Sequence, residues 1–195
     1  MTILVIGSNS DIGKSISDKL NIKKYSVVNL QRSDIDFDEK DSTQKVFKIL
    51  DKHKPDAIVN CVGVLGTNSD DYETVFNANF KSNWDIIRYY IKCETSYPVK
   101  FLMIGSSSYS SGRKAYMLYS ASKAALYNLF LSACSYFSQS QLVVGLINLP
   151  RVKTKMISHL LNPDSDCMEV EEASDFIVDF LLDLKLHTSV DLGVK

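Results

Sequence analysis

Short apolar runs alternate with helical patterns along most of the 195-residue chain. The apolar runs are rich in β-branched residues and end at turn residues, as strands do. They lie at Thr2–Ile6, Tyr25–Leu30, Asp56–Asn60, Val99–Ile104 and Leu142–Asn148. The helical patterns lie between and after them, at Ile12–Leu20, Ser42–Lys52, Asp70–Cys93, Tyr119–Tyr136 and Glu169–Leu184. Strands that are apolar on both faces and separated by helices predict an α/β fold, in which helices cover both faces of a parallel sheet.

Two further segments, Asp34–Phe37 and Ser189–Asp191, have weaker strand patterns. They would bring the sheet to about seven strands. The chain shows no internal repeat, low-complexity tract or linker. We therefore predict one doubly wound domain over residues 1–195.

The charge pattern argues against several classes of partner. The formal net charge is −1 and no block of like charge occurs, so we expect neither nucleic acid nor a membrane surface as partner. The longest apolar runs have the length of strands and are too short to span a bilayer as a helix. Residues 1–6 lack a basic start and run into a glycine, which is typical of a strand and not of a signal peptide. A cytoplasmic protein is the expectation.

The cysteines and histidines are scattered, without the close pairs that metal sites need. They are Cys61, Cys93, Cys134, Cys167, His53, His159 and His187. We expect free thiols in a reducing compartment and no bound metal.

The first strand ends in a glycine turn, Gly7-Ser-Asn-Ser-Asp-Ile-Gly13, and a helix follows. Such a turn lets backbone amides point at the pyrophosphate of a dinucleotide. Gly7 allows the tight turn and Gly13 the close approach of helix to sheet. Short polar side chains for the same ligand come from Ser8, Asn9 and Ser10. For the carboxylate of Asp11 we expect an N-cap role, which turns its charge toward the helix amides and away from phosphate.

The choice between NADP and NAD should depend on the end of the second strand, Leu30-Gln-Arg-Ser-Asp34. A cation there favours the 2′-phosphate of NADP, whereas an acidic residue favours the ribose hydroxyls of NAD. Arg32 is the nearest charge and Ser33 adds a hydroxyl, so we predict NADP. Asp34 keeps NAD possible, and a merely solvated Arg32 is the alternative.

Tyr119 and Lys123 lie four residues apart in Tyr119-Ser-Ala-Ser-Lys123, one turn apart if the segment is helical. An ammonium beside a phenol lowers the pKa of the phenol and makes it suitable for acid/base work on a carbonyl or alcohol. Ser106 could hydrogen-bond the same substrate oxygen. The plainer alternative is an exposed lysine beside a half-buried tyrosine on an amphipathic helix.

Together these motifs resemble the short-chain dehydrogenase/reductase family, in its single-domain branch, over Thr2 to Gly193. The resemblance implies a Rossmann-type sheet with the strand order 3-2-1-4-5-6-7. It implies adenosine contacts from Asp36 and Phe37, and further cofactor contacts from Ile12, Asn60, Gly63, Pro150, Val152 and Thr154. Arg151 stands where the family usually has glycine, which puts the backbone course there in question.

The resemblance also implies an activity, hydride transfer between nicotinamide and a carbonyl or alcohol of a small molecule. Tyr119 would pass the proton, Lys123 would bind the nicotinamide ribose and lower the pKa of Tyr119, and Ser106 would orient the substrate. Asn79 would support the lysine through water, with Asn77 as a competitor for that role. Ser107 and Ser108 leave a small ambiguity over which serine is catalytic.

Several alternatives stay open at this point. Residues 154–168 form either a short substrate lid, with Met156, Ile157, Leu160 and Leu161, or a small packed helix. Arg113 and Lys114 either bind an anionic group of the substrate or are solvated.

Two other functions compete with the enzyme. One is a catalytically silent NADP(H)-binding regulatory protein. The other is a sugar epimerase or dehydratase, which usually needs a C-terminal substrate domain and is not preferred here. The family's isologous packing of two helices, here Asp70–Cys93 and Tyr119–Tyr136, implies a homodimer or homotetramer.

Overall fold

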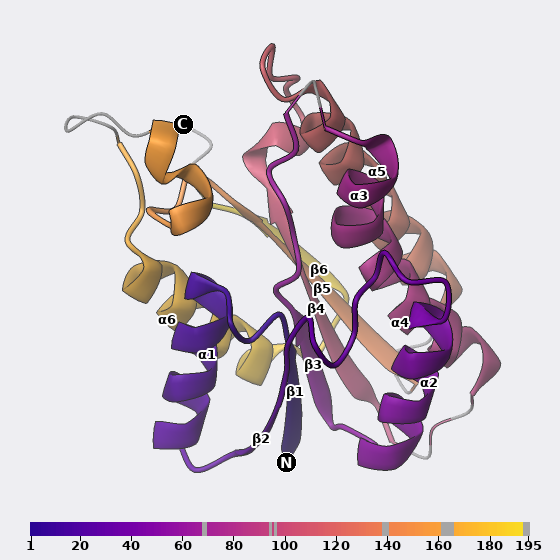
Figure 1. Cartoon of the computed structure of the whole chain (residues 1–195). Coiled ribbons are helices and arrows are strands. Elements are labelled where there is room, and N and C mark those ends of the chain that lie inside the picture. Colours follow the sequence, from indigo (N-terminus) through magenta and orange to yellow (C-terminus); the bar gives the residue numbers. More distant parts are fainter. Residues whose placement is uncertain (68–69, 94, 96, 138–140, 161–165, 193–195) are drawn as a thin grey trace.

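The computed structural model describes residues 1–67, 70–93, 95, 97–137, 141–160 and 166–192. Its centre is a parallel sheet of six strands in the order β2-β1-β3-β4-β5-β6 (Figure 1). The strands are β1 (Thr2–Ile6), β2 (Ser26–Leu30), β3 (Ala57–Asn60), β4 (Val99–Ser106), β5 (Leu142–Leu149) and β6 (Thr188–Asp191). The predicted doubly wound α/β fold is confirmed, and the weak strand pattern near Ser189–Asp191 corresponds to β6.

Helices cover both faces of the sheet (Figure 1). One face carries α1 (Asp11–Ile22) and α6 (Val170–Asp183), and the other carries α2 (Ser42–His53), α4 (Ser82–Lys92) and α5 (Met117–Tyr136). Alternate residues of a strand point to opposite faces, so β1 contributes to both cores. Leu4 and Ile6 pack into the first core, while Ile3 and Val5 pack into the second. Each such fully buried side chain stabilises the fold by about 1.5–3 kcal/mol.

The strand expected at Asp34–Phe37 is not formed, so the sheet has one strand fewer than predicted. Its backbone is used locally instead, because the amides of Asp34 and Ile35 both donate to the carbonyl of Gln31, at 3.0 and 3.1 Å. Ile35 and Phe37 are buried in the core beneath this turn. The apolar residues that suggested a strand therefore anchor a turn, and β2 is the edge of the sheet.

The long helix expected at Asp70–Cys93 is interrupted. A short helix, α3 (Tyr72–Phe76), leads into a π-helical turn at Asn77–Lys81, and α4 follows. A π turn holds one residue more than an α turn and occurs often at functional sites. The buried Asn79 lies in this turn.

Within the described ranges no helix is long and apolar enough to cross a membrane. The same residues contain no group of histidine, cysteine or acidic side chains that could hold a metal ion.

Candidate active site

The glycine turn between β1 and α1 is held by its own hydrogen bonds. Gly7 has φ +78°, a conformation that favours glycine, and its amide donates to the carbonyl of Leu30 at 2.9 Å. The Ser10 hydroxyl donates to the Gly7 carbonyl at 2.8 Å and accepts from the Gly13 amide at 3.1 Å. A Cβ on Gly13 would lie 2.3 Å from the Gly7 carbonyl oxygen. The turn therefore requires glycine at both positions, and it fits the close backbone approach that a pyrophosphate needs.

Asp11 does not cap α1, contrary to our prediction. Ser10 is the N-cap, because its side chain accepts from the Gly13 amide while its backbone stays extended. Asp11 is the first helical residue, and its carboxylate accepts from the backbone amide of Lys155 at 2.7 Å. The glycine turn and the segment after β5 are thus connected by this carboxylate.

The α5 helix places Tyr119 and Lys123 one turn apart, as predicted. The Lys123 ammonium lies 5.7 Å from the centre of the Tyr119 ring and donates to the Ile104 carbonyl at 2.9 Å. Ser106 ends β4, and its side chain hydrogen-bonds Tyr119. The Ser106 hydroxyl also accepts from the Ser108 amide at 3.2 Å. This geometry supports Ser106, among the neighbouring serines, as the partner of Tyr119.

Burial decides the protonation of both residues. It raises the pKa of Tyr119, and the hydrogen bond with Ser106 opposes that rise only in part. We expected Lys123 to lower the pKa of Tyr119, but its ammonium is bonded to a carbonyl and lies over the ring. Burial also lowers the pKa of Lys123 from 10.5 to about 8. Tyr119 is therefore a phenol at neutral pH, in the form that can donate a proton.

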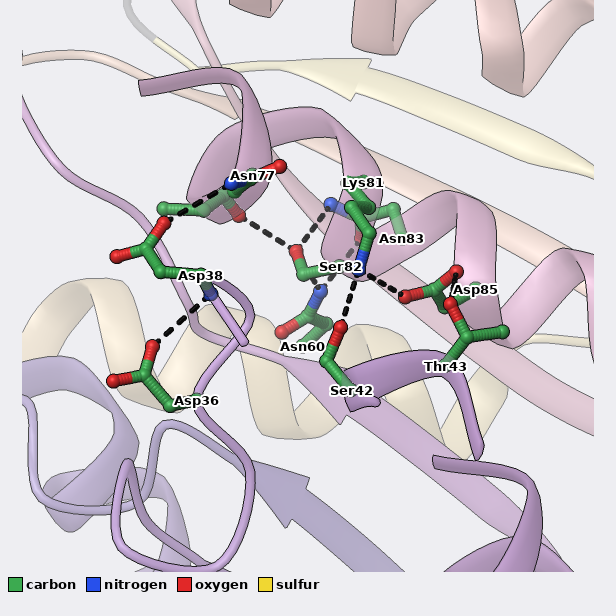
Figure 2. A network of polar contacts seen from close by, with 11 residues as sticks. Asp36, Asp38, Ser42, Thr43, Asn60, Asn77, Lys81, Ser82, Asn83 and Asp85 are labelled. Carbon is green, nitrogen blue, oxygen red and sulfur yellow. Dashed lines mark hydrogen bonds and ion pairs between the residues drawn. The ribbon is translucent and has the colours of Figure 1, made fainter. Parts of the chain in front are cut away.

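Asn79 orders the loop that faces Lys123. Its side-chain oxygen accepts from the Val64 amide at 2.9 Å, and its side-chain nitrogen donates to the Val64 carbonyl at 3.0 Å and to Ser122 at 2.9 Å. A Cβ on Gly63 would lie 3.1 Å from the Asn79 oxygen and 3.8 Å from the Lys123 nitrogen. Asn79 is thus a neighbour of the lysine, whereas the competing Asn77 bonds Asp38 at 3.1 Å (Figure 2).

Asn60 ends β3 and is buried. Its side-chain nitrogen donates to Ser82 at 2.9 Å and to Asn83 at 3.0 Å (Figure 2). Its side-chain oxygen accepts from the Val62 amide at 3.1 Å. This side chain therefore connects the loop after β3 to α4.

A half-buried ion pair fixes the end of the π turn against α2. The Lys81 ammonium lies 3.0 Å from the carboxylate of Asp85, which is 1% exposed (Figure 2). Thr43 donates to the same carboxylate at 2.9 Å, and Lys81 also donates to Ser42. Removing one partner of such a pair is costly because the other charge stays buried. The position of the π turn is therefore well determined.

A cavity of about 350 Å³ opens beyond the carboxyl ends of the strands. It is lined by ten of the predicted site residues, Asn9, Ser10, Ile12, Gly63, Ser106, Tyr119, Lys123, Pro150, Val152 and Thr154. The other predicted residues do not line it: Gly7, Ser8, Gly13, Arg32, Ser33, Asp36, Phe37, Asn60 and Asn79. Gly7, Gly13, Asn60 and Asn79 instead shape the loops that form its wall.

Seven polar residues line the cavity without having been predicted as site residues. They are Asp11, Ser107, Ser108, Arg113, Tyr116, Arg151 and Lys155. The sequence offered a signal for most of them, because Asp11 lies in the glycine turn, Ser107 and Ser108 follow Ser106, and Arg113 lies in the segment before Tyr119.

The predicted NADP determinant lies outside the cavity and is paired. Arg32 bonds Asp36 at 2.9 Å and Asp38 at 3.1 Å, and its side chain is 69% exposed. The guanidinium holds the pKa of the Asp36 carboxyl below its usual range. Phe37 is a core residue, 5% exposed. A 2′-phosphate would therefore share Arg32 with two carboxylates.

The expected lid begins at the cavity. A 3-10 helix, Lys155–Leu160, places Met156, Ile157 and Leu160 on its lining, and Met156 and Leu160 are exposed. The base of the segment is held where Val152 pairs with Met168 as a β-bridge. Leu161 and residues 162–165 of the predicted lid, and Gly193 at the end of the family resemblance, lie outside the described residues.

Fold, glycine turn and cavity together define a Rossmann-type nucleotide-binding protein. The family model for the "NAD dependent epimerase/dehydratase family" matches residues 3–149. The chain belongs to this family, a branch of the short-chain dehydrogenase/reductase superfamily, and the predicted superfamily is confirmed.

Relatives and solved structures agree with this assignment. The chain is 33% identical over 169 residues to the bifunctional ribulose 5-phosphate reductase/CDP-ribitol pyrophosphorylase Bcs1 of Haemophilus influenzae, covering 79% of this chain and 34% of that protein. It thus spans about a third of the length of this relative.

Two solved structures show the same fold. A short-chain dehydrogenase from Burkholderia cenocepacia J2315 in complex with NADP has a TM-score of 0.81, at 16% identity, covering 99% of this chain and 88% of that one. The 3-alpha-hydroxysteroid dehydrogenase from Pseudomonas sp. B-0831, complexed with NADH, has a TM-score of 0.82, at 14% identity and coverage of 98% and 95%.

The buried Lys123 should leave a signature in the pH dependence of stability. Its pKa is about 8 in the folded protein and 10.5 when free, so the unfolded chain binds more protons between these values and stability rises with pH there. In Lys123→Met this contribution is absent. Relative to that variant, we expect the wild type to gain about 2 kcal/mol of unfolding free energy between about pH 7 and about pH 9.5, measured by urea denaturation.

The matched control is Lys92→Met, since Lys92 is exposed on α4. Its unfolding free energy should follow that of the wild type over the same range. A constant difference between wild type and Lys123→Met would contradict the depressed pKa of Lys123.

Proposed function

We propose that this protein is an NAD(P)(H)-dependent oxidoreductase that reduces a carbonyl group of a small molecule, or oxidises the corresponding alcohol. The observation that carries the proposal is that Ser106, Tyr119 and Lys123 line the same cavity as the glycine turn. When bound, the nicotinamide cofactor supplies or accepts the hydride. Activity is tested by following NADPH and NADH consumption with a carbonyl substrate.

Each residue of the set has a chemical task in this proposal. The Tyr119 phenol donates a proton to the substrate oxygen, and its raised pKa keeps the proton in place at neutral pH, which suits reduction. The Ser106 hydroxyl, already bonded to Tyr119, orients the same oxygen. Lys123 binds the nicotinamide ribose, and Asn79 keeps the adjoining loop in position.

The Haemophilus relative suggests the first substrate to test. Its name combines a ribulose 5-phosphate reductase with a CDP-ribitol pyrophosphorylase. Of these two activities, the reductase is the one that a Ser–Tyr–Lys set on a Rossmann-type sheet can perform. We therefore propose reduction of ribulose 5-phosphate, a ketose, to the corresponding alditol phosphate.

The proposed cofactor is NADP(H), with NAD(H) as the alternative. If Arg32 receives the 2′-phosphate, Arg32→Ala should weaken NADPH binding by about 10- to 100-fold, because charge-assisted hydrogen bonds are lost, and leave NADH binding unchanged. Asp38→Asn should strengthen NADPH binding, since one competing carboxylate is removed. Fluorescence titration of both cofactors measures these effects.

Arg88→Ala is the control for the removal of a cation, because Arg88 is exposed on α4. Equal effects of Arg32→Ala on both cofactors would contradict the assignment to NADP.

The homodimer or homotetramer and the cytoplasmic location stay predictions. Large apolar side chains are exposed on the two helices expected at the interface, Ile91 on α4 and Met117, Leu131 and Tyr136 on α5. Sedimentation velocity at micromolar concentration measures the oligomeric state.

A further inference from the structure

The cavity is positively charged, although the whole chain carries a net charge of −1. Among the described residues, its lining includes Arg113, Lys123, Arg151 and Lys155, against a single acidic residue, Asp11. Asp11 is already engaged, since its carboxylate accepts from the Lys155 amide at 2.7 Å and lies 3.9 Å from the Lys155 ammonium. The remaining cations make the cavity suitable for a ligand with negative charge.

The cations come from two different walls. Arg151 and Lys155 belong to the segment after β5, which also carries Thr154 and reaches the glycine turn through Asp11. Arg113 belongs to the loop between β4 and α5, which lies apart from that segment beyond the carboxyl ends of the strands (Figure 1). Arg113 is therefore the cation that this loop contributes to the cavity.

The backbone of Arg113 is fixed although its side chain is exposed. Its amide donates to the Ser120 hydroxyl at 3.1 Å, and its carbonyl accepts from the Tyr116 amide at 2.9 Å. Ser120 and Tyr116 flank Tyr119 in the sequence, so Arg113 is held at the start of α5, beside the proton donor. Among the described residues, no carboxylate forms an ion pair with its guanidinium.

We propose that Arg113 binds the phosphate of a phosphorylated carbonyl substrate, and so selects that substrate over its unphosphorylated form. The inference rests on the proposed function and extends it to the residue that recognises the substrate. A guanidinium matches phosphate oxygens with two parallel hydrogen bonds, which fixes the orientation of the ligand as well as its affinity. The structure also separates the two cations of this loop, because Arg113 lines the cavity and Lys114 lines only the adjoining hollow.

The test compares kcat/KM for ribulose 5-phosphate and for ribulose. The wild type should prefer the phosphate, and Arg113→Ala should lose about 10- to 100-fold on the phosphate while keeping its rate on ribulose. Arg113→Lys retains the charge but not the planar pair of N–H donors. Its kcat/KM for ribulose 5-phosphate should therefore lie between those of the wild type and Arg113→Ala. Lys114→Ala is the matched control from the same loop and should behave as the wild type.

A binding measurement keeps the proposal testable independently of turnover. Ribitol 5-phosphate should raise the melting temperature of the wild type and of Lys114→Ala more than ribitol does, and this difference should vanish in Arg113→Ala. If neither ketose is reduced but the difference holds, the proposed reaction fails and the phosphate site stands. Two results would overturn the role of Arg113. One is an equal loss of kcat/KM on ribulose 5-phosphate and on ribulose in Arg113→Ala. The other is that ribitol 5-phosphate stabilises the wild type, Lys114→Ala and Arg113→Ala equally.

Discussion

Tyr119→Phe should lower the rate of carbonyl reduction by about 10²- to 10⁴-fold, the usual contribution of a positioned proton donor. The substitution removes a single hydroxyl, and the ring stays packed over Lys123. We therefore expect NADPH to bind as it does to the wild type, so that the loss falls on kcat. Steady-state kinetics and fluorescence titration of the cofactor measure the two quantities separately.

Tyr116→Phe is the matched control, because Tyr116 lines the same cavity and loses the same hydroxyl. Its kcat should stay within a few-fold of the wild type. Similar losses of kcat in Tyr119→Phe and Tyr116→Phe would contradict the role of Tyr119 as the proton donor. Full activity of Tyr119→Phe would end the assignment of a tyrosine-dependent oxidoreductase.

Gly13→Ala should abolish measurable cofactor binding and destabilise the fold. The added Cβ would lie 2.3 Å from the Gly7 carbonyl oxygen, and backbone at that distance must shift. Overpacking of this kind costs about 1–3 kcal/mol of unfolding free energy. The shift would distort the turn that is expected to bind the pyrophosphate. Thermal unfolding and fluorescence titration with NADPH measure the two consequences.

Gly112→Ala is the control for this substitution, because no atom of the described residues, its chain neighbours aside, lies within 4 Å of the Cβ that it would add. Gly112→Ala should unfold at the same temperature as the wild type and bind NADPH with the same affinity. Unchanged NADPH binding by Gly13→Ala would show that the glycine turn does not hold the cofactor.

Much of the architecture could be predicted because it depends on local patterns. Strands apolar on both faces require cover on both faces, and β1 and β5 are buried along nearly their whole length. The spacing of Tyr119 and Lys123 survives in the structure because a helix repeats every 3.6 residues.

The errors arose at turns, where more than one local hydrogen-bonding pattern fits the same residues. At Asp34–Phe37 the alternation of apolar residues suggested a strand, but the amides are satisfied by Gln31 within a turn. At the start of α1 two adjacent residues could cap, and the side-chain hydrogen bond and extended backbone of Ser10 show which of them does.

The protonation of Tyr119 could not be predicted from spacing either. Helical spacing places an ammonium near a phenol, but the depth of burial and the Ile104 carbonyl that binds Lys123 are properties of the tertiary fold. The pairing of Arg32 with Asp36 and Asp38 likewise depends on how the chain folds after β2.

The π turn at Asn77–Lys81 makes this part of the chain sensitive to length. It holds one residue more than an α-helical turn does, so deleting one residue here would leave α3 and α4 as one regular helix. Because the π turn takes up the extra residue by widening, α3 and α4 would keep nearly their present faces after the deletion, and the change would fall on the turn itself. Asn79 lies in that turn, so deleting it would remove its hydrogen bonds to Val64 and Ser122, and with them the side chain that orders the loop facing Lys123.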